Sequence, residues 1–373
     1  MGLRNREYLD ISPHQEQMNE NLYEVLPILH QENNQGAPDL TFEDFKDVSE
    51  LERSRDKEWL REQESKKSSE KHELGVFFEA ALPQAGYYGW LGDVEFVNFK
   101  KNSAIDRYND RKGTDFMIEL PPDKKGGKSS VLRIDATTGS DVDRLSQKVA
   151  GQAEVELGNG KFGGVYFKTN FPGKGRPEKE KINSAPRVVM YLDYGQITEL
   201  GLQLVAHKVK GDKEARKSLE ESSLQLTLIE QARRQLESQA ILALAMFTEK
   251  VEKYGRNKKL PAEQVEAVQG LFERLSQAVE AKDSSKALEL VNEFLNSEHL
   301  KNLPRSIETK KILEGLTPWL DHFSKLEQEK KDSLPEQASK KALIEAEVSR
   351  PHQVLTDFPS EARSHLPRGL QLV

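Results

Sequence analysis

The chain of 373 residues carries 62 acidic and 55 basic residues, a net charge of −7, and 36 % of its residues are hydrophobic. This composition predicts a soluble chain, and its length suits two or three domains, since a typical domain has about 100–200 residues. The longest apolar run, residues 240–247, is far shorter than the ~20 residues of a membrane-spanning helix. With no cysteine, the chain lacks thiolate nucleophiles, thiolate zinc sites and disulfides, and we expect it in the cytoplasm.

Residues 1–65 form an acidic segment with 16 acidic and 7 basic residues, a local charge of −9. Its apolar positions are sparse, and the stretch from Phe42 to Glu64 is the best candidate for a helix. We interpret the segment as an arm with one docked helix, and disorder throughout is the alternative. We expect neither a secretory signal nor a lipid anchor, because an apolar stretch is missing and Arg6 does not fit a myristoylation site.

Residues 66–211 predict an α/β domain. Helical spacing over residues 74–82 indicates a first helix that Pro83 and Gly86 should stop. Apolar segments then predict five strands, at residues 93–99, 115–120, 131–137, 163–169 and 187–192. The second and third strands should pair as a hairpin, because the loop that joins them is rich in proline, glycine and lysine.

A helix over residues 142–153 is predicted between the third and fourth strands. Its length is that of a crossover connection, so it can bring the strand at 163–169 parallel to the third strand. A helix over 197–209 closes the α/β domain.

Residues 212–349 show only helical patterns and predict an α-helical domain whose polar faces could bind a protein partner. Apolar stripes indicate helices over 224–247, from Pro261 onward and over 287–295. Thr317-Pro318 has the pattern of an N-cap followed by proline at the first helical position. Residues 350–373 hold three prolines and predict a disordered tail.

Three carboxylates stand where the predicted topology can bring them together. Asp115 begins the second strand and Asp135 lies near the end of the third, so the two aspartates should meet at one edge of the hairpin. Glu79, on the first helix, could lean over them. Asp115 could instead cap a turn, and Glu79 could be solvated or ion-paired. Asp135 stands in an apolar strand and needs compensation, by a metal ion, Arg133 or a lysine.

These pieces resemble the PD-(D/E)XK nuclease-like superfamily, whose core is a helix, a three-strand meander, a crossover helix and a fourth strand. The matching motifs, within residues 70–210, are Phe78-Glu79-Ala80-Ala81, Gly113-Thr114-Asp115-Phe116 and Arg133-Ile134-Asp135-Ala136-Thr137. The resemblance implies a mixed-sheet, restriction-endonuclease-like fold and metal-dependent cleavage of phosphodiester bonds, as in a DNA endonuclease. It also implies that Glu79, Asp115 and Asp135 hold Mg²⁺ or Mn²⁺.

One position departs from the superfamily pattern. Thr137 stands where a lysine usually follows two positions after the acidic residue of the third strand, and threonine brings no positive charge. Such a lysine can come from another element, and the candidates are Lys148, on the crossover helix, and Lys168, on the fourth strand. The alternative function is a catalytically degenerate nuclease-like fold that serves as a nucleic-acid or protein binding module.

Two segments of the α/β domain are locally basic. Residues 99–133 and 161–181 each carry a net charge of +4. Lysine and arginine beside a carboxylate cluster would suit the phosphate backbone of a nucleic acid, although ordinary soluble loops have the same composition. The eight histidines are dispersed without metal-ligand spacing, and the chain has no Gly-x-Ser-x-Gly motif, so serine hydrolase chemistry has no support.

Overall fold

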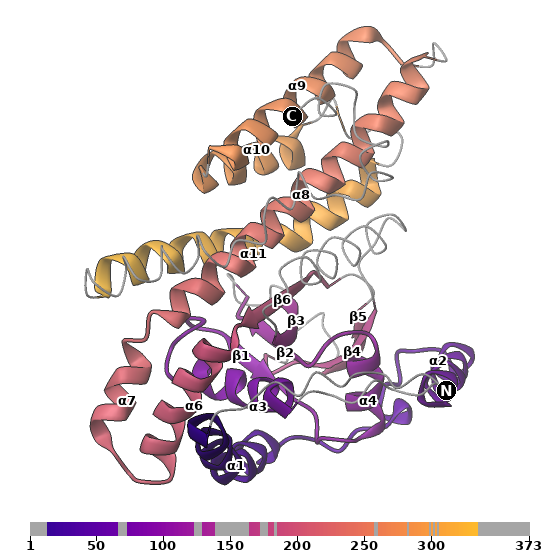
Figure 1. Cartoon of the computed structure of the whole chain (residues 1–373). Coiled ribbons are helices and arrows are strands. Elements are labelled where there is room, and N and C mark those ends of the chain that lie inside the picture. Colours follow the sequence, from indigo (N-terminus) through magenta and orange to yellow (C-terminus); the bar gives the residue numbers. More distant parts are fainter. Residues whose placement is uncertain are drawn as a thin grey trace, which may run out of the picture.

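A computed structural model of the chain describes residues 13–65, 73–122, 129–138, 164–171, 178–182, 185–256, 260–281, 283–297, 300, 303 and 306–334. A mixed α/β N-terminal region precedes a largely helical C-terminal part (Figure 1). None of the helices in these ranges is long and apolar enough to cross a membrane. The predicted crossover helix over 142–153 and the tail 350–373 lie outside the described residues.

The helices fall into two groups along the chain. Those of the α/β region are α1 (Pro13–Asn34), the short 3-10 helix η1 (Phe42–Asp44), α2 (Glu50–Ser65), α3 (Glu73–Tyr87), α4 (Ala104–Arg111) and α6 (Tyr194–Lys208). Those that follow are α7 (Lys213–Glu220), α8 (Leu224–Arg256), α9 (Ala262–Glu280), α10 (Ser284–Asn296) and α11 (Ser306–Ser333).

The centre of the α/β region is a four-stranded mixed sheet in the order β1-β2-β3-β6. Its strands are β1 (Glu95–Val97), β2 (Phe116–Leu120), β3 (Ser130–Thr138) and β6 (Arg187–Leu192). The first three form an antiparallel meander, which confirms the predicted hairpin between β2 and β3. β6 lies parallel to β3 at one side of the meander.

The prediction that the strand at 163–169 lies beside the third strand is wrong. That segment forms β4 (Val165–Lys168), which pairs with β5 (Lys179–Ile182) in a separate two-stranded sheet. Every residue of β6 is buried, as expected for a strand that is covered on both faces. β5 was not predicted, because three of its four residues are charged and it has no apolar alternation.

Side chains of the central sheet alternate between two faces that belong to different hydrophobic clusters. Leu132 and Ile134 of β3 belong to the larger cluster, with residues of α1, α3, α6 and the C-terminal helices. Met117 and Val131 belong to the smaller cluster, with residues of η1, α2, α4 and β4. Figure 1 shows α3 and α6 on one side of the sheet and α4 with β4 on the other. We call these sides the α3 face and the α4 face.

Residues 13–65 of the acidic N-terminal segment are a layer of the fold. The predicted docked helix within 42–64 is present as α2, but α1 is a second packed helix, so the description of the rest of the segment as an arm is wrong for these residues. α1 packs against α3 and α6, and its Val25 and Leu29 are fully buried. η1 and α2 cover the α4 face, where Phe45 is fully buried and Trp59 contacts Tyr108 edge to face. The sequence did not indicate α1 because most of its residues are polar and only a narrow apolar stripe is buried.

Two prolines that were predicted as helix boundaries lie inside helices. Pro83 lies within α3, and Pro318 lies within α11, so no helix begins at Thr317. A proline in a helix interior removes a backbone hydrogen bond, and burial of neighbouring apolar residues offsets that loss. Leu82 and Trp319, each next to one of these prolines, are fully buried.

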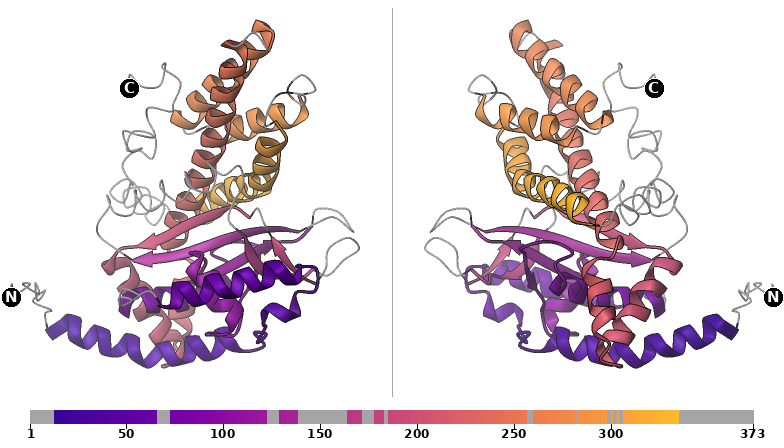
Figure 2. Two further views of the ribbon diagram at one scale, coloured as in Figure 1. Left: turned by 90° about the vertical axis from the view of Figure 1, so that its right-hand side faces the viewer. Right: turned by 90° about the vertical axis from the view of Figure 1, so that its left-hand side faces the viewer.

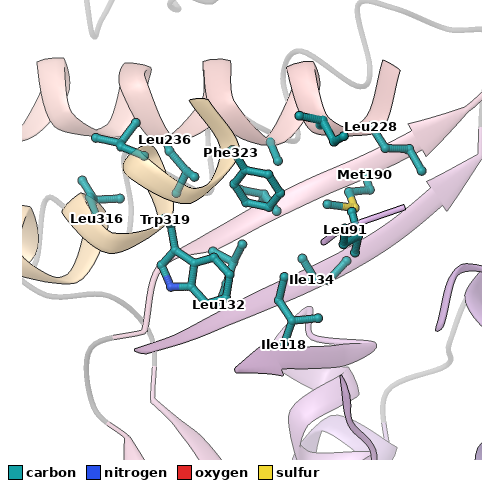
Figure 3. Packing of buried hydrophobic residues seen from close by; sticks show 14 of the residues in the cluster. Leu91, Ile118, Leu132, Ile134, Met190, Leu228, Leu236, Leu316, Trp319 and Phe323 are labelled. Atoms are coloured by element: carbon teal, nitrogen blue, oxygen red, sulfur yellow. The ribbon is translucent and has the colours of Figure 1, made fainter. Parts of the chain in front are cut away.

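One hydrophobic cluster continues from the sheet into the C-terminal helices. α8 packs along α11 and α9, and α10 packs against both of the latter. Figure 3 shows Trp319 and Phe323 of α11 and Leu236 of α8 beside Leu132 of β3. From there α8 extends away from the sheet toward α9 and α10 (Figure 2). The two parts of the chain are therefore joined by a shared core.

Three glutamines of α8 close the outer edge of β6. The bonded pairs are Gln231 with Tyr191, Gln235 with Val189 and Gln239 with Arg187. In the first two pairs the glutamine amide accepts from the strand N–H and donates to the strand carbonyl, at 2.7–3.0 Å. Four helical residues rise about 6 Å, nearly the length of two strand residues, so the two spacings match. The side chains of α8 thus make the hydrogen bonds that a neighbouring strand would make, and they keep this edge from pairing with another chain.

Candidate site at an aspartate pair

The hairpin of β2 and β3 places Asp115 and Asp135 side by side. Phe116 pairs with Ile134, so the next position along the ladder sets Asp115 against Asp135. The Asp115 N–H donates to the Ile134 carbonyl at 2.9 Å, and the Asp115 carboxylate accepts the Ala136 N–H at 2.7 Å. Asp135 is only 5 % exposed. The two aspartates are therefore opposite each other at the end of the ladder between β2 and β3.

Glu79 does not complete a three-carboxylate cluster with this pair. Asp135 alternates with Ile134 and Ala136, which belong to the α3 face, so Asp135 lies on the α4 face. α3, which carries the half-buried Glu79, packs on the opposite face. Within the ranges that the structure describes, no group of three or more histidine, aspartate or glutamate side chains is placed to hold a metal ion.

Of the two candidate lysines, only Lys168 is among the described residues, and it is ion-paired elsewhere. Lys148 lies outside the described residues. Lys168 is the last residue of β4, and its ammonium lies 3.5 Å from the Glu178 carboxylate. β4 is not a neighbour of β3, so the predicted position of Lys168 next to the third strand is wrong.

Two arginines lie opposite each other on the α4 face of β3 and β6. Arg133 is fully buried, and its Nε donates to the Ala185 carbonyl at 2.9 Å. Arg187 is 9 % exposed, and its Nη1 donates to the Lys112 carbonyl at 2.8 Å. The Arg187 guanidinium therefore lies at the turn that leads into Asp115, and positive charge shares this face with the aspartate pair.

The glycine of the Gly113-Thr114-Asp115 motif has a structural role. Its N–H donates to the Asp110 carbonyl at 2.8 Å as α4 ends, and its φ of +69° is in the left-handed region that favours glycine. A Cβ at this position would overlap the Nη1 atom of Arg187. The turn and the arginine both require glycine here.

We expect Gly113→Ala to lower the free energy of unfolding by about 2–4 kcal/mol, since backbone strain of about 1–2 kcal/mol adds to displacement of Arg187. Gly211→Ala is the matched control, because Gly211 has a φ of +70° and nothing within 4 Å of the added Cβ. Urea denaturation should show a loss of only about 1 kcal/mol for the control. Equal losses in the two variants would mean that the contact with Arg187 contributes nothing.

Several basic side chains that the sequence suggested as phosphate contacts are paired with acids of the N-terminal segment. The pairs are Lys100 with Asp39 at 2.8 Å, Arg107 with Glu64 at 3.0 Å, Lys179 with Asp44 at 3.6 Å, and Lys181 with Glu52 at 2.9 Å and Asp56 at 2.6 Å. The local charge along the sequence does not reveal these partners, because the acidic and the basic segments are far apart in the chain and meet only in the fold. These side chains give little support to a phosphate-binding role.

A polar cluster on the α4 face was not predicted. Asp56 of α2 accepts hydrogen bonds from the hydroxyls of Tyr108 at 3.1 Å and Tyr166 at 2.8 Å, beside its ion pair with Lys181. Burial, together with the charge of Asp56, raises the pKa of both tyrosines. Both phenols thus stay protonated and act as donors that fix α2. Sequence reasoning could not find the cluster, because its members come from four separate elements, α2, α4, β4 and β5.

Glu119 is a fully buried carboxylate on the α4 face of β2. It accepts hydrogen bonds from the Thr169 hydroxyl at 2.5 Å, from the Asn170 N–H at 2.8 Å and from the Ser129 hydroxyl. These bonds attach the end of β4 to the central sheet, so the burial of Glu119 has a structural explanation.

No family model matches this chain, and neither a curated protein nor a solved structure matches it. The superfamily resemblance therefore depends on the order of the elements and on the short motifs.

Proposed function

We propose that the α/β region cleaves phosphodiester bonds in nucleic acid, with DNA as the expected substrate and a divalent metal ion held by Asp115 and Asp135. The observation that supports this most directly is the strand register that sets the two aspartates side by side. Carboxylate oxygens are the ligands that Mg²⁺ and Mn²⁺ prefer, so this donor set fits such an ion. The chemistry that the ion supplies when bound is activation of water and neutralisation of charge on the leaving oxygen.

The arrangement of the elements also supports a restriction-endonuclease-like core. α3 precedes an antiparallel meander of β1, β2 and β3, and β6 follows as a parallel neighbour of β3. These elements follow the order of the superfamily core, with β6 rather than β4 as the fourth strand, and the predicted crossover helix lies outside the described residues. α4, between β1 and β2, and the small sheet of β4 and β5 are additions to that order.

A catalytically degenerate core that binds nucleic acid or protein is the second candidate. It is favoured by the placement of Glu79 on the opposite face, by Thr137 in the lysine position and by the Arg187 guanidinium at the turn before Asp115. Arginine charge beside two carboxylates can compensate them without an ion. In that case the helical part would offer its polar surface to a partner.

Two measurements on Asp135→Asn separate these candidates. Wild-type protein should bind Mn²⁺ in calorimetry and nick supercoiled plasmid with Mg²⁺ or Mn²⁺, and the variant should lose both properties because its amide is a weaker metal ligand. Asp47→Asn, at an exposed aspartate before α2, is the control and should keep both. A wild-type chain that neither binds Mn²⁺ nor nicks DNA would contradict cleavage, and retention of labelled DNA without metal would then support the binding module.

A further inference from the structure

A groove of about 580 Å³ lies where α11 meets the α/β region. Its walls are the loop after α3, the ends of β2 and β3 around Leu120 and Ser130, and the side of α11 from Pro318 to Lys330. This volume is in the range of small-molecule sites, which occur preferentially where two parts of a protein meet. The groove is distant in sequence from the aspartate pair and independent of the function proposed above.

The loop after α3 is held tightly against α11, so the groove is formed before any ligand binds. The His322 Nε2 donates to the Leu91 carbonyl at 2.9 Å. Gly92 has a φ of +74°, and a Cβ there would come within 3.1 Å of His322 and 3.2 Å of Leu326. A preformed wall lowers the entropy that a ligand must lose on binding.

Lys330 gives the groove a positive charge that no described side chain binds directly, although the charge of Glu329 acts on it. The side chain is half-buried, and its ammonium makes no hydrogen bond or ion pair with the part of the chain that the structure describes. Lys325, in the same groove, is bonded to Asp321 at 2.7 Å. Burial lowers the pKa of His322 below 6.5, so the imidazole adds no charge at neutral pH. Burial also lowers the pKa of Lys330, although the charge of Glu329 acts in the opposite direction.

We propose that this groove binds a small molecule with a single carboxylate and an apolar body, with the carboxylate against Lys330. A carboxylate supplies the charge-assisted hydrogen bonds that the ammonium lacks. The exposed acids Asp93 and Glu329 at the rim repel an anion in proportion to its charge, so a single carboxylate is disfavoured less than a phosphate or a dicarboxylate. Leu120 and Leu326 offer apolar surface to the body of the ligand.

Calorimetry with benzoate tests the proposal on the full chain. Lys330→Met keeps the length of the side chain and removes the charge, and it should weaken benzoate binding about tenfold or more. Lys325→Met, at a side chain that is 68 % exposed, should change the affinity less than about threefold. Benzyl alcohol and inorganic phosphate should bind more weakly than benzoate. Absence of benzoate binding to the wild type, equal affinity in Lys330→Met, or equal binding of either comparison molecule would overturn the proposal.

Acetylation of lysines, read by mass spectrometry, gives a second measurement that does not depend on a variant. Benzoate should slow the acetylation of Lys330 and leave the rate at Lys331, which is bonded to Glu327, unchanged. Equal rates at Lys330 with and without benzoate would likewise count against the site.

Discussion

Arg233→Met is expected to lower the free energy of unfolding by about 3–5 kcal/mol, because it leaves the buried Glu237 carboxylate without its arginine and leaves Glu327 with only Lys331. Arg233 of α8 is 4 % exposed and donates to Glu327 of α11 at 2.5 Å and to Glu237 at 2.6 Å. It also donates to the hydroxyl of Ser284 at the start of α10. One guanidinium thus joins three helices of the C-terminal part, and urea denaturation at pH 7 measures its loss.

Arg234 is the matched control, since it neighbours Arg233 on α8 and pairs with Glu230 of the same helix. Its side chain is 31 % exposed, so Arg234→Met should cost less than about 1 kcal/mol. Adding Glu237→Leu and Glu327→Leu to Arg233→Met should restore most of the lost stability, because no buried charge then remains unpaired. Similar losses of stability for Arg233→Met and Arg234→Met would show that the buried ion pairs of Arg233 contribute no more to stability than the exposed ion pair of Arg234.

The same network gives a pH dependence. Burial by itself would raise the pKa of Glu327, but Arg233 and Lys331 hold it below its ordinary value of 4.5. A lowered pKa in the folded state contributes stability above the unfolded pKa, and this contribution disappears as pH falls through the folded value. Wild-type protein should therefore lose this contribution below about pH 4.5. In Arg233→Met the carboxyl stays buried without its arginine, so the difference in stability between the two proteins should narrow as pH falls from 7 to 4.

Gln235→Leu is expected to lower the free energy of unfolding by about 2–5 kcal/mol, since each buried backbone group without a partner costs about 1–3 kcal/mol. Gln235 is the only partner outside the strand ladder that the structure describes for the N–H and carbonyl of Val189, and both residues are buried. The amide of Val189 should also exchange its hydrogen faster than in the wild type. Denaturation and hydrogen exchange measured by NMR check both effects.

Two further substitutions define what the glutamine contributes. Gln235→Glu has nearly the same shape but cannot donate to the Val189 carbonyl, so it should also destabilise the protein. Gln277→Leu makes the same chemical change at an exposed position of α9, and it should alter the stability by less than about 0.5 kcal/mol. If Gln235→Leu proved as mild as Gln277→Leu, the edge of β6 would not need the glutamine.

The elements with regular patterns could be predicted from sequence. The meander, β6 and α6 have clear apolar spacing, and their order followed from it. Sheet neighbours were harder, because the pairing of β3 with β6 instead of β4 is decided by contacts across some fifty residues. α1, α4 and β5 were missed because each is mainly polar and buries only a few side chains.

Only the part of the candidate site that a single hairpin determines could be predicted from the sequence. Asp115 and Asp135 meet because a hairpin fixes their register. The side of the sheet on which Glu79 lies depends on how α3 packs, and the sequence alone does not specify this. Arg187 enters from β6, whose place beside β3 had been assigned to β4. Pattern reasoning therefore found the pair and missed the arginine that shares its face.

Because α8 is attached along β6, the distance between its far end and the aspartate pair is fixed. α8 has 33 residues and is roughly 50 Å long at 1.5 Å per residue. Its first half is bonded to the strand that neighbours Asp135, and its second half carries the α9 and α10 pair. The helix is thus a rigid spacer, and any macromolecule held at its far end is kept at a set separation from the two carboxylates.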